Sequence, residues 1–300
     1  MPEEKIVVAG GSGLIGRALQ RSLRADGYRV VLLVRREARG PDEVAWLREG
    51  DGPLDPTVLE GARAVVGLNG ASIGKFPWTK AYRKLLRDSR LTPTTAIADA
   101  VRALGANAPL FVSASAVGYY GTQPPAPADE ASAPGDGFLA ELCVDWEAAA
   151  LSAGPDARVA LLRTAPVVHR DGVLKPLILL TKLGISGPIA GGHQKWPFIS
   201  LADEVGAIRH IIDQQLTGAF NLAAPVPASA NGLGRSLAAG LRRPYLVPVP
   251  GFAVKLVLGK DAAEALLTCD AVAIPKALTD SGYEFEHPTV REAVAAALRE

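Results

Sequence analysis

The sequence predicts an α/β fold in which helices cover both faces of a parallel β-sheet. Two observations support this. Short, almost wholly apolar runs alternate with helical segments through the first 165 residues, and a glycine-rich turn joins the first run to the first helix. Parallel strands are buried on both faces, so they show continuous apolar runs. With 300 residues, 48% of them apolar, the chain can form one large core or two modest ones.

The first elements form one strand–helix–strand unit. The apolar run Lys5–Ala9 predicts a strand, and Leu14–Ala25, with apolar residues at helical spacing, predicts the helix that follows. Asp26-Gly27 ends this helix, because glycine is common just beyond a helix terminus. The run Arg29–Val34 predicts a second strand, which completes a βαβ unit of about 30 residues.

The same alternation continues to residue 165. Further strands are predicted at Ala64–Leu68, Leu110–Ser115 and Arg158–Arg163, with helices near Thr79–Leu104 and Phe138–Ala153. Beyond this point the pattern weakens into connections rich in proline and glycine. We therefore expect a core over residues 1–165 and a smaller substrate-side and C-terminal region over 166–300, with segments near 198–222 returning to the core.

Charge and hydropathy exclude two classes of partner. Lysine and arginine number 32 against 31 acidic residues, so the net charge of +1 leaves no basic surplus for binding nucleic acid. The longest apolar stretches, such as those at 173–183 and 262–267, end well short of the roughly 18–20 residues of a membrane span. We expect neither a nucleic acid nor a membrane as a partner.

The cysteines and the first residues favour a cytoplasmic protein. Cys143 and Cys269 are too few for a disulfide framework, and neither belongs to a Cys-x-x-Cys pair. The four histidines lack the spacing of a zinc site, so no metal is expected. No secretory signal is visible at the start of the chain.

The glycine-rich turn indicates a dinucleotide site. Gly10, Gly13 and Gly16 have the spacing for a tight turn, a close approach of backbone to a pyrophosphate, and packing of helix on strand. The helix begins with Leu14 and Ile15, where free N–H groups and the helix dipole favour an anion. A glycine triplet alone could be an ordinary sharp turn, but here the required strand precedes it and the required helix follows it.

The end of the second strand favours NADP(H) over NAD(H). An acidic residue here would bind the ribose 2′-hydroxyl of NAD, whereas an arginine accommodates the 2′-phosphate of NADP. Arg35 and Arg36 follow the strand. The alternative that they are ordinary surface arginines stays open.

Several segments occur in an order typical of one known family. They include GGSGLIGRAL, FVSASAVGYYG, GFLAELCVDWEAAA, GAFNLAAP and RPYLVPVPGFAVKLVLG. In these segments the chain resembles the atypical, epimerase-like branch of the extended short-chain dehydrogenase/reductases, the YfcH-type proteins, and the last segment is specific to that branch. The resemblance implies a Rossmann-like fold with an NADP-binding core and a small C-terminal region on the substrate side.

The resemblance and the strand ends together imply the cofactor contacts. Besides the three glycines, these are Leu14, Ile15, Arg35, Arg36, Gly67, Leu68, Asn69, Arg90, Ser113 and Ala114. One departure concerns the segment Gly67-Leu68-Asn69-Gly70, where the family usually has Asn-Leu-Ala-Gly. The side chain of the family's first asparagine is absent, and Asn69 replaces it on the same face only if the strand extends that far.

The catalytic residues of the wider superfamily are incomplete in this chain. Ser115 matches a serine that orients the substrate oxygen in that superfamily. A Tyr-x-x-x-Lys normally follows on the next helix, but Phe138 or Leu139 takes the tyrosine position and Leu142 or Cys143 the lysine position. Phenylalanine and leucine cannot transfer protons, so the usual acid is missing.

Tyr119 and Glu141 are candidates to replace this acid. Tyr119, or its neighbour Tyr120, could bring a phenol close to Ser115, and Glu141 could act as an acid with a raised pKa. Each has a structural alternative, because tyrosines after a strand commonly pack in loops and glutamates on helices are commonly solvated.

Two main functions follow as hypotheses. The first is an NADP(H)-dependent oxidoreductase or epimerase-like enzyme for a small polar metabolite such as a sugar nucleotide. The second is a non-catalytic NADP(H)-binding redox sensor or regulatory module. A role at cell division rests on family labels alone. A homodimer remains open in each case.

Overall fold

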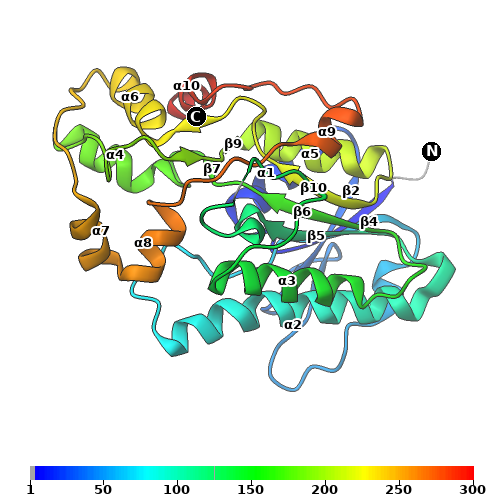
Figure 1. Ribbon diagram of the computed structural model, residues 1–300. Helices are drawn as coiled ribbons and strands as arrows, with labels where there is room; N and C mark the ends of the chain where they lie inside the picture. Colours follow the sequence, from blue (N-terminus) through cyan, green and yellow to red (C-terminus); the bar gives the residue numbers. More distant parts are fainter. Residues whose placement is uncertain (1–3, 125) are drawn as a thin grey trace.

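The computed structural model describes residues 4–124 and 126–300 (Figure 1). The strands are β1 (Lys5–Ala9), β2 (Arg29–Val34), β3 (Glu43–Ala45), β4 (Ala62–Gly67), β5 (Leu110–Ala116), β6 (Val159–Thr164), β7 (Val167–Val168), β8 (Lys195–Trp196), β9 (Ile199–Ser200), β10 (Gly218–Leu222) and β11 (Ala228–Ser229). The helices are α1 (Leu14–Ala25), α2 (Lys80–Leu104), α3 (Phe138–Leu151), α4 (Leu174–Lys182), α5 (Leu201–Asp213), α6 (Ala230–Gly240), α7 (Gly251–Leu258), α8 (Lys260–Leu266), α9 (Lys276–Asp280) and α10 (Val290–Arg299).

The described part of the chain is built around one parallel sheet with the strand order β10-β6-β5-β4-β1-β2-β3. The chain direction across the sheet reverses at β1, where β2 and β3 lie on one side and β4 and β5 on the other. In sheets of this kind, ligands bind outside the carboxyl ends of the strands at the point of reversal. The predicted doubly wound α/β fold is confirmed.

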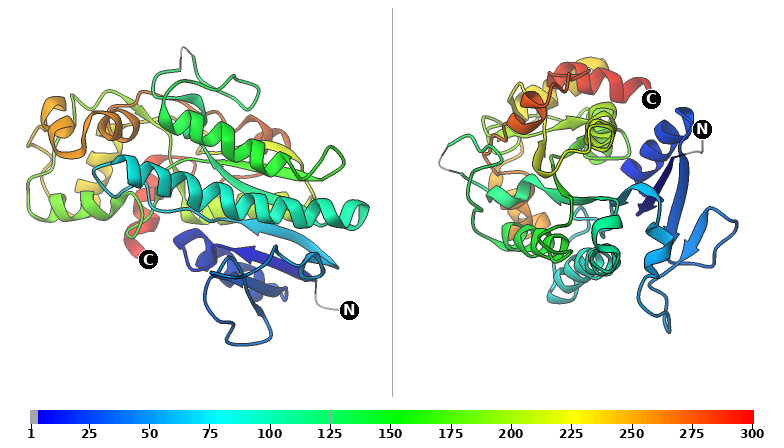
Figure 2. Two further views of the ribbon diagram at one scale, coloured as in Figure 1. Left: turned by 90° about the horizontal axis from the view of Figure 1, so that it is seen from below. Right: turned by 90° about the vertical axis from the view of Figure 1, so that its right-hand side faces the viewer.

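Helices cover both faces of the sheet (Figure 2). Helices α2 and α3 pack together on one face, and α1 and α5 pack together on the other. Successive residues of a strand point to opposite faces. Phe111 therefore joins the cluster that contains Ile97 of α2, whereas its neighbour Val112 joins the cluster that contains Ile208 of α5. This alternation also decides the direction of the polar residues at the end of β5.

The elements at the start of the chain have the predicted bounds. The strands β1 and β2 and the helix α1 begin and end at the predicted residues, and Gly27 follows α1 with a φ of +81°. Helix α2 begins one residue after its capping residue Thr79, whose side chain accepts a hydrogen bond from the Tyr82 N–H. Strand β4 covers Ala62–Gly67, so it ends one residue earlier than predicted.

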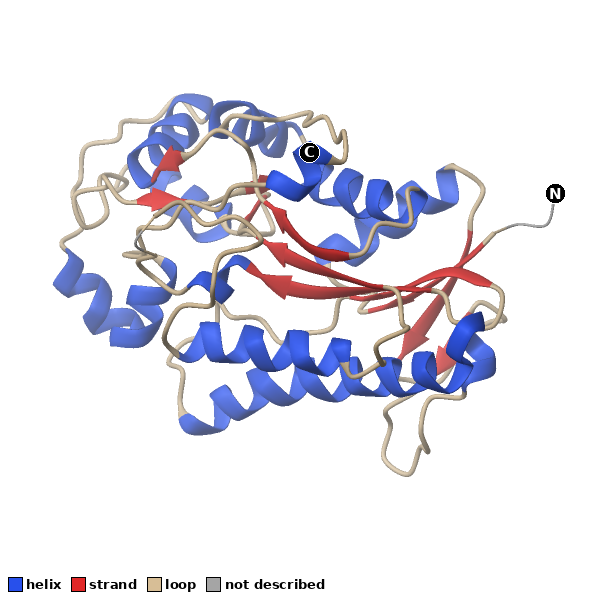
Figure 3. Ribbon diagram, turned by 45° about the vertical axis from the view of Figure 1, so that its right-hand side comes forward, coloured by secondary structure: helices blue, strands red, loops and turns tan. Residues whose placement is uncertain are grey.

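A second cluster of elements lies beyond the carboxyl edge of the sheet (Figure 3). Helices α4, α6 and α10 contribute to one apolar cluster that includes Leu174, Leu237 and Val294. Strand β10 does not belong to this cluster, because it pairs with β6 in the main sheet. No helix in the described residues is both long and apolar enough to cross a membrane.

Candidate functional site at the carboxyl edge of the sheet

The glycine-rich turn joins β1 to α1, and its glycines differ in what surrounds them. A Cβ on Gly10, whose φ is +80°, would lie 2.6 Å from the carbonyl group of Leu68. A Cβ on Gly16 would lie 2.5 Å from the Gly10 carbonyl oxygen. Packing within the chain therefore requires both glycines. At Gly13, by contrast, a Cβ would meet no described atom within 4 Å except the Gly10 oxygen, at 3.4 Å.

The start of α1 is open to an anion. Gly13 is the capping residue of α1, and no side chain of the described residues caps the helix there. Leu14 and Ile15 form the first turn and are half-buried. Because the first N–H groups of a helix have no partner within the helix, this end carries a partial positive charge. The open space at Gly13 gives a ligand access to these groups.

Arg35 and Arg36 follow β2 and have different partners. Arg36 donates two hydrogen bonds to the Glu43 carboxylate, at 2.7 and 2.6 Å, and this contact lowers the pKa of Glu43 to about 2. Arg35 is exposed and has no hydrogen bond or ion pair with any residue that the structure describes. Arg36 is therefore bound to the protein itself, and Arg35 is available to a phosphate group.

The chain after β4 passes directly beside the glycine turn. Gly67 is buried, with Ile97 and Phe111 around the position where a Cβ would lie. The N–H of Leu68 donates to the Ala9 carbonyl at 3.0 Å. Asn69 lies beyond the end of the strand, so strand alternation does not set its direction. Its Oδ1 atom is buried and accepts no hydrogen bond from the described part of the protein.

Arg90 on α2 brings a further cation to this region. A Cβ on Gly70 would lie 3.1 Å from the Arg90 guanidinium carbon, so this side chain rests against the backbone after β4. The guanidinium also lies over the Trp146 ring, 5.1 Å from its centroid, and donates to the Leu86 carbonyl. Burial lowers the pKa of Arg90, and no described carboxylate forms an ion pair with it. A half-buried arginine without an acidic partner favours an anionic ligand.

The end of β5 directs its two serines away from α1. Ser113 and Ser115 point toward α3, whereas Ala114 points toward the face covered by α1 and α5. The Ser113 side chain is completely buried, and its hydroxyl makes a 3.4 Å contact with the Ala114 carbonyl. Because the exposed fraction of the whole residue is zero, neither the side chain nor the backbone of Ser113 is open to a ligand here, contrary to the predicted cofactor contact.

Ser115 belongs to a buried polar network. Its hydroxyl donates to Glu147 Oε1 on α3 at 2.7 Å. Arg163 on β6 binds both oxygens of the same carboxylate at 2.9 Å, and it donates to the Tyr120 hydroxyl at 2.9 Å. Tyr120 in turn donates to Asn221 Oδ1 on β10 at 2.7 Å. Backbone carbonyls complete the network, because Asn221 Nδ2 donates to Ala128 and Ile274 and Arg163 also donates to Glu130.

The charges within this network stabilise one another. Burial alone would lower the pKa of Arg163, but the Glu147 carboxylate and the Tyr120 hydroxyl raise it above its ordinary value. The guanidinium also stacks on Tyr119, 3.6 Å from the ring centroid. Arg163 thus fixes the position of both tyrosines that follow β5.

The structure places the three candidate catalytic residues differently. Ser115 is 3% exposed and engaged with Glu147. Tyr119 is half-buried, and its hydroxyl makes no hydrogen bond within the described chain. Glu141 is exposed on the first turn of α3, so the carboxylate that reaches Ser115 comes from Glu147 instead. Burial raises the pKa of the Cys143 thiol to about 12, which keeps it protonated and unreactive.

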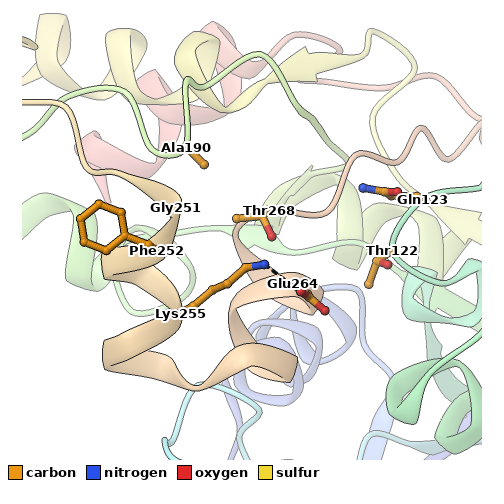
Figure 4. A pocket seen from close by; sticks show the side chains of 8 residues that line it. All are labelled: Thr122, Gln123, Ala190, Gly251, Phe252, Lys255, Glu264 and Thr268. Atoms are coloured by element: carbon orange, nitrogen blue, oxygen red, sulfur yellow. Dashed lines mark hydrogen bonds and ion pairs between the residues drawn. The ribbon is translucent and has the colours of Figure 1, made fainter.

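A cleft of about 610 Å³ lies between the turn after β5 and the helices α7 and α8 (Figure 4). Its lining consists of Thr122, Gln123, Ala190, Gly251, Phe252, Lys255, Glu264 and Thr268. This volume lies within the usual range for small-molecule sites. Thr122 is three residues after Tyr119 in the chain, which limits the distance between their Cα atoms to roughly 11 Å.

A doubly wound parallel sheet with this glycine turn at the point of reversal defines a protein of the Rossmann-like α/β class. More particularly, the chain belongs to the NAD-dependent epimerase/dehydratase family, whose profile matches residues 6–223. A domain of unknown function, DUF1731, matches residues 249–297. The predicted membership of the epimerase-like branch is confirmed.

The relatives cover nearly the whole chain. An epimerase family protein of Mycobacterium leprae is 39% identical over 295 residues, which are 97% of this chain and 95% of that protein. A crystal structure of the human epimerase family protein SDR39U1 with NADPH has a TM-score of 0.89 and 30% identity, and the match covers 98% of this chain and 99% of that one. The nucleoside-diphosphate sugar epimerase of Corynebacterium glutamicum has a TM-score of 0.77 and 28% identity, with coverage of 99% and 58%.

Sequence reasoning misses Glu147 and Arg163 as neighbours of Ser115. A signal is present for Arg163, which is the one charged residue of the strand Val159–Thr164. Charged side chains are rarely buried unless they are paired, so a buried partner for Arg163 could be expected. Glu147 is one of three acidic residues on α3, with Glu141 and Asp145, and the sequence does not show which of them is the partner.

Proposed function

We propose that this protein binds NADPH at the carboxyl edge of the sheet and is an oxidoreductase or epimerase-like enzyme for a small polar molecule. The observation that carries the proposal is the set of unpartnered polar groups around the open turn at Gly13. The guanidinium of Arg35, the guanidinium of Arg90 and the Oδ1 atom of Asn69 all lack a described partner that would neutralise or satisfy them. A phosphorylated dinucleotide has the charges and hydroxyl groups that they require.

Each part of the dinucleotide has residues that fit it. The open start of α1, at Gly13 and Leu14, suits the pyrophosphate. Arg35 suits the 2′-phosphate, because its guanidinium is not occupied by an acidic residue. Asn69 Oδ1 is a hydrogen-bond acceptor and suits a ribose hydroxyl or an amino group. The human relative that was crystallised with NADPH supports this assignment.

Bound NADPH would supply a hydride, and the residues of the chain would then orient the substrate and supply the proton. Because the Ser115 hydroxyl donates its hydrogen bond to Glu147, its oxygen is left to accept a hydrogen bond from a substrate hydroxyl group. The Tyr119 hydroxyl is the candidate proton donor, since Arg163 fixes its ring while leaving the hydroxyl unpartnered within the described chain. This assignment replaces the missing Tyr-x-x-x-Lys with a tyrosine from the turn after β5.

The preference for NADPH tests the cofactor assignment. Arg35→Ala should weaken NADPH binding about tenfold or more, because it removes a charge-assisted contact to the 2′-phosphate, and should leave NADH binding unchanged. Arg36→Ala is the matched control, since Arg36 is occupied by Glu43. Fluorescence titration of both nucleotides measures the effect. Equal affinities for NADPH and NADH in the wild-type protein would overturn the assignment of Arg35.

A non-catalytic NADPH-binding protein is the second candidate, and one observation favours it. Ser115 is only 3% exposed and already bound to Glu147, so its hydroxyl is poorly placed for a substrate. Oxidation of NADPH in the presence of a panel of carbonyl compounds separates the two candidates. Turnover that Tyr119→Phe lowers supports the enzyme. Tight NADPH binding without any turnover supports the sensor or regulatory module.

A homodimer remains a prediction for either candidate. Light scattering coupled to size-exclusion chromatography measures the mass in solution, which for one chain is 31.3 kDa.

A further inference from the structure

We infer that the cleft beside α7 and α8 takes an uncharged, hydroxylated small molecule and discriminates against phosphorylated or nucleotide-linked ones. This inference rests on the proposed function, because it takes the cleft, which begins at Thr122, three residues after Tyr119, as the place of the substrate. It differs from the expectation of a sugar nucleotide. The arguments are the charge balance of the described lining residues and the free hydrogen-bonding groups.

The charges of the described lining residues cancel. Among them Lys255 on α7 is the cation, and its ammonium group binds Glu264 Oε1 on α8 at 2.9 Å (Figure 4). Their side chains are 45% and 36% exposed, so both face the solvent space of the cleft. A phosphate that approached Lys255 would have to displace the Glu264 carboxylate and would then lie beside its negative charge. The pair therefore opposes an anionic ligand.

Arg163, the cation in contact with Tyr119, is not available to a phosphate either. Arg163 lies beneath Tyr119, but both oxygens of Glu147 bind it and its side chain is only 5% exposed. Breaking this buried pair to bind a phosphate would leave the Glu147 carboxylate unpaired in the protein interior, at a high cost in free energy. A diphosphate substrate would thus find no free positive charge on Arg163 or Lys255.

The same cleft suits hydroxyl groups. The side chains of Thr122 and Gln123 make no hydrogen bond with the described residues, so they are free to donate to and accept from a ligand. Thr268 adds a third hydroxyl to the lining, although it already donates to the Ala263 carbonyl. The ring of Phe252 is 75% exposed and points away from Thr122 and Gln123 (Figure 4), so the polar groups carry this argument. Neutral polar groups match an uncharged, hydroxylated carbonyl compound.

The test removes the negative partner from the pair. Glu264→Gln leaves the Lys255 ammonium unpaired at nearly constant shape, so affinity for inorganic phosphate and for glucose 6-phosphate should rise about tenfold. The double variant Lys255→Met with Glu264→Gln is the matched control, because its lining is again uncharged and should show no rise. Phosphorus NMR measures phosphate binding, and calorimetry compares glucose, glucose 6-phosphate and UDP-glucose. Circular dichroism checks that each variant is folded.

The outcomes separate this inference from the proposed function. All titrations are carried out with and without NADPH, and NADPH binding is measured on its own. Failure to bind NADPH would overturn the proposed function, whereas the response of phosphate to Glu264→Gln does not depend on the cofactor. The inference is overturned if Glu264→Gln leaves phosphate affinity unchanged. It is also overturned if wild-type protein binds glucose 6-phosphate or UDP-glucose more tightly than glucose.

Discussion

The polar groups at the carboxyl edge of the sheet form two sets, one with hydrogen-bond partners inside the protein and one without. On the α3 side, Ser115, Glu147, Arg163, Tyr120 and Asn221 form a buried network in which each side chain satisfies another. None of these five residues is more than 7% exposed.

Around the glycine turn and the end of β4, the polar groups have no such partners. Arg35 lacks a carboxylate among the described residues, and the buried Asn69 Oδ1 atom accepts no hydrogen bond from them. Arg90 reaches the same region from α2, on the face covered by α2 and α3, and it too forms no ion pair with a described carboxylate. An unsatisfied buried polar group costs free energy, and a bound ligand is one way to satisfy it. The difference is what the proposed function requires, with a network that stabilises the fold beside α3 and unpaired groups around the glycine turn that a cofactor would satisfy.

The largest expected effect is on the network. Glu147→Ala would leave Arg163 buried and unpaired, so the free energy of unfolding should fall by about 3–5 kcal/mol. Urea denaturation measures the change. The exposed pair Lys84–Asp88 provides the control, because Asp88→Ala should cost less than about 1 kcal/mol. If both variants lowered the free energy of unfolding equally, Arg163 would be as well solvated as a surface residue, and the network would not stabilise the fold.

Gly13→Val should separate binding from folding. The backbone φ of Gly13 is −72°, which valine adopts, and a Cβ there would meet only one described atom, so the fold should persist. Its branched side chain would occupy the space in front of α1 and weaken NADPH binding about a hundredfold. Gly16→Val is the contrasting control, because its Cβ would lie 2.5 Å from a backbone oxygen and should destabilise the fold itself. Wild-type affinity in Gly13→Val would place the pyrophosphate elsewhere.

Glu204 on α5 is a third case, because it is a buried polar group without a full set of partners that lies inside the core. It is completely buried, its Oε1 accepts from the Thr164 hydroxyl at 2.9 Å, and its Oε2 has no described partner. Burial raises the pKa of Glu204 to about 8, from an ordinary value of 4.5. Between these pH values the unfolded chain releases this proton and the folded chain keeps it. The folded state therefore loses stability as the pH rises, by up to about 1.4 kcal/mol per pH unit.

Glu204→Gln should remove this part of the pH dependence. Glutamine has nearly the shape of the protonated acid and does not ionise, so the variant should gain stability relative to wild type between pH 6 and pH 7.5, by up to about 2 kcal/mol. Thermal unfolding at both pH values measures the difference. A constant difference between variant and wild type across this range would show that Glu204 ionises as readily in the folded protein as in the unfolded one.

Most local elements of the first 165 residues could be predicted from the sequence, although β3 (Glu43–Ala45) was not. The strands β1 and β2 and the helix α1 have their predicted bounds, because continuous apolar runs, helical spacing and a terminal glycine are properties of neighbouring residues. The turn at Gly10–Gly16 was predicted for the same reason, since strand, turn and helix are contiguous. The alternation of elements was then sufficient for the fold class, because it admits few arrangements other than a doubly wound sheet.

The partners of the polar residues were decided by the tertiary structure. The sequence contains Arg35 and Arg36 side by side, and nothing in their order shows that Glu43 of β3 occupies the second and leaves the first free. Likewise, Glu141 and Glu147 both lie on α3, but only the second faces β5 and reaches Ser115. Local patterns determine which residues share an element and a face. The pairing of charges between elements depends on how distant segments pack, and short-range spacing carries no information about it.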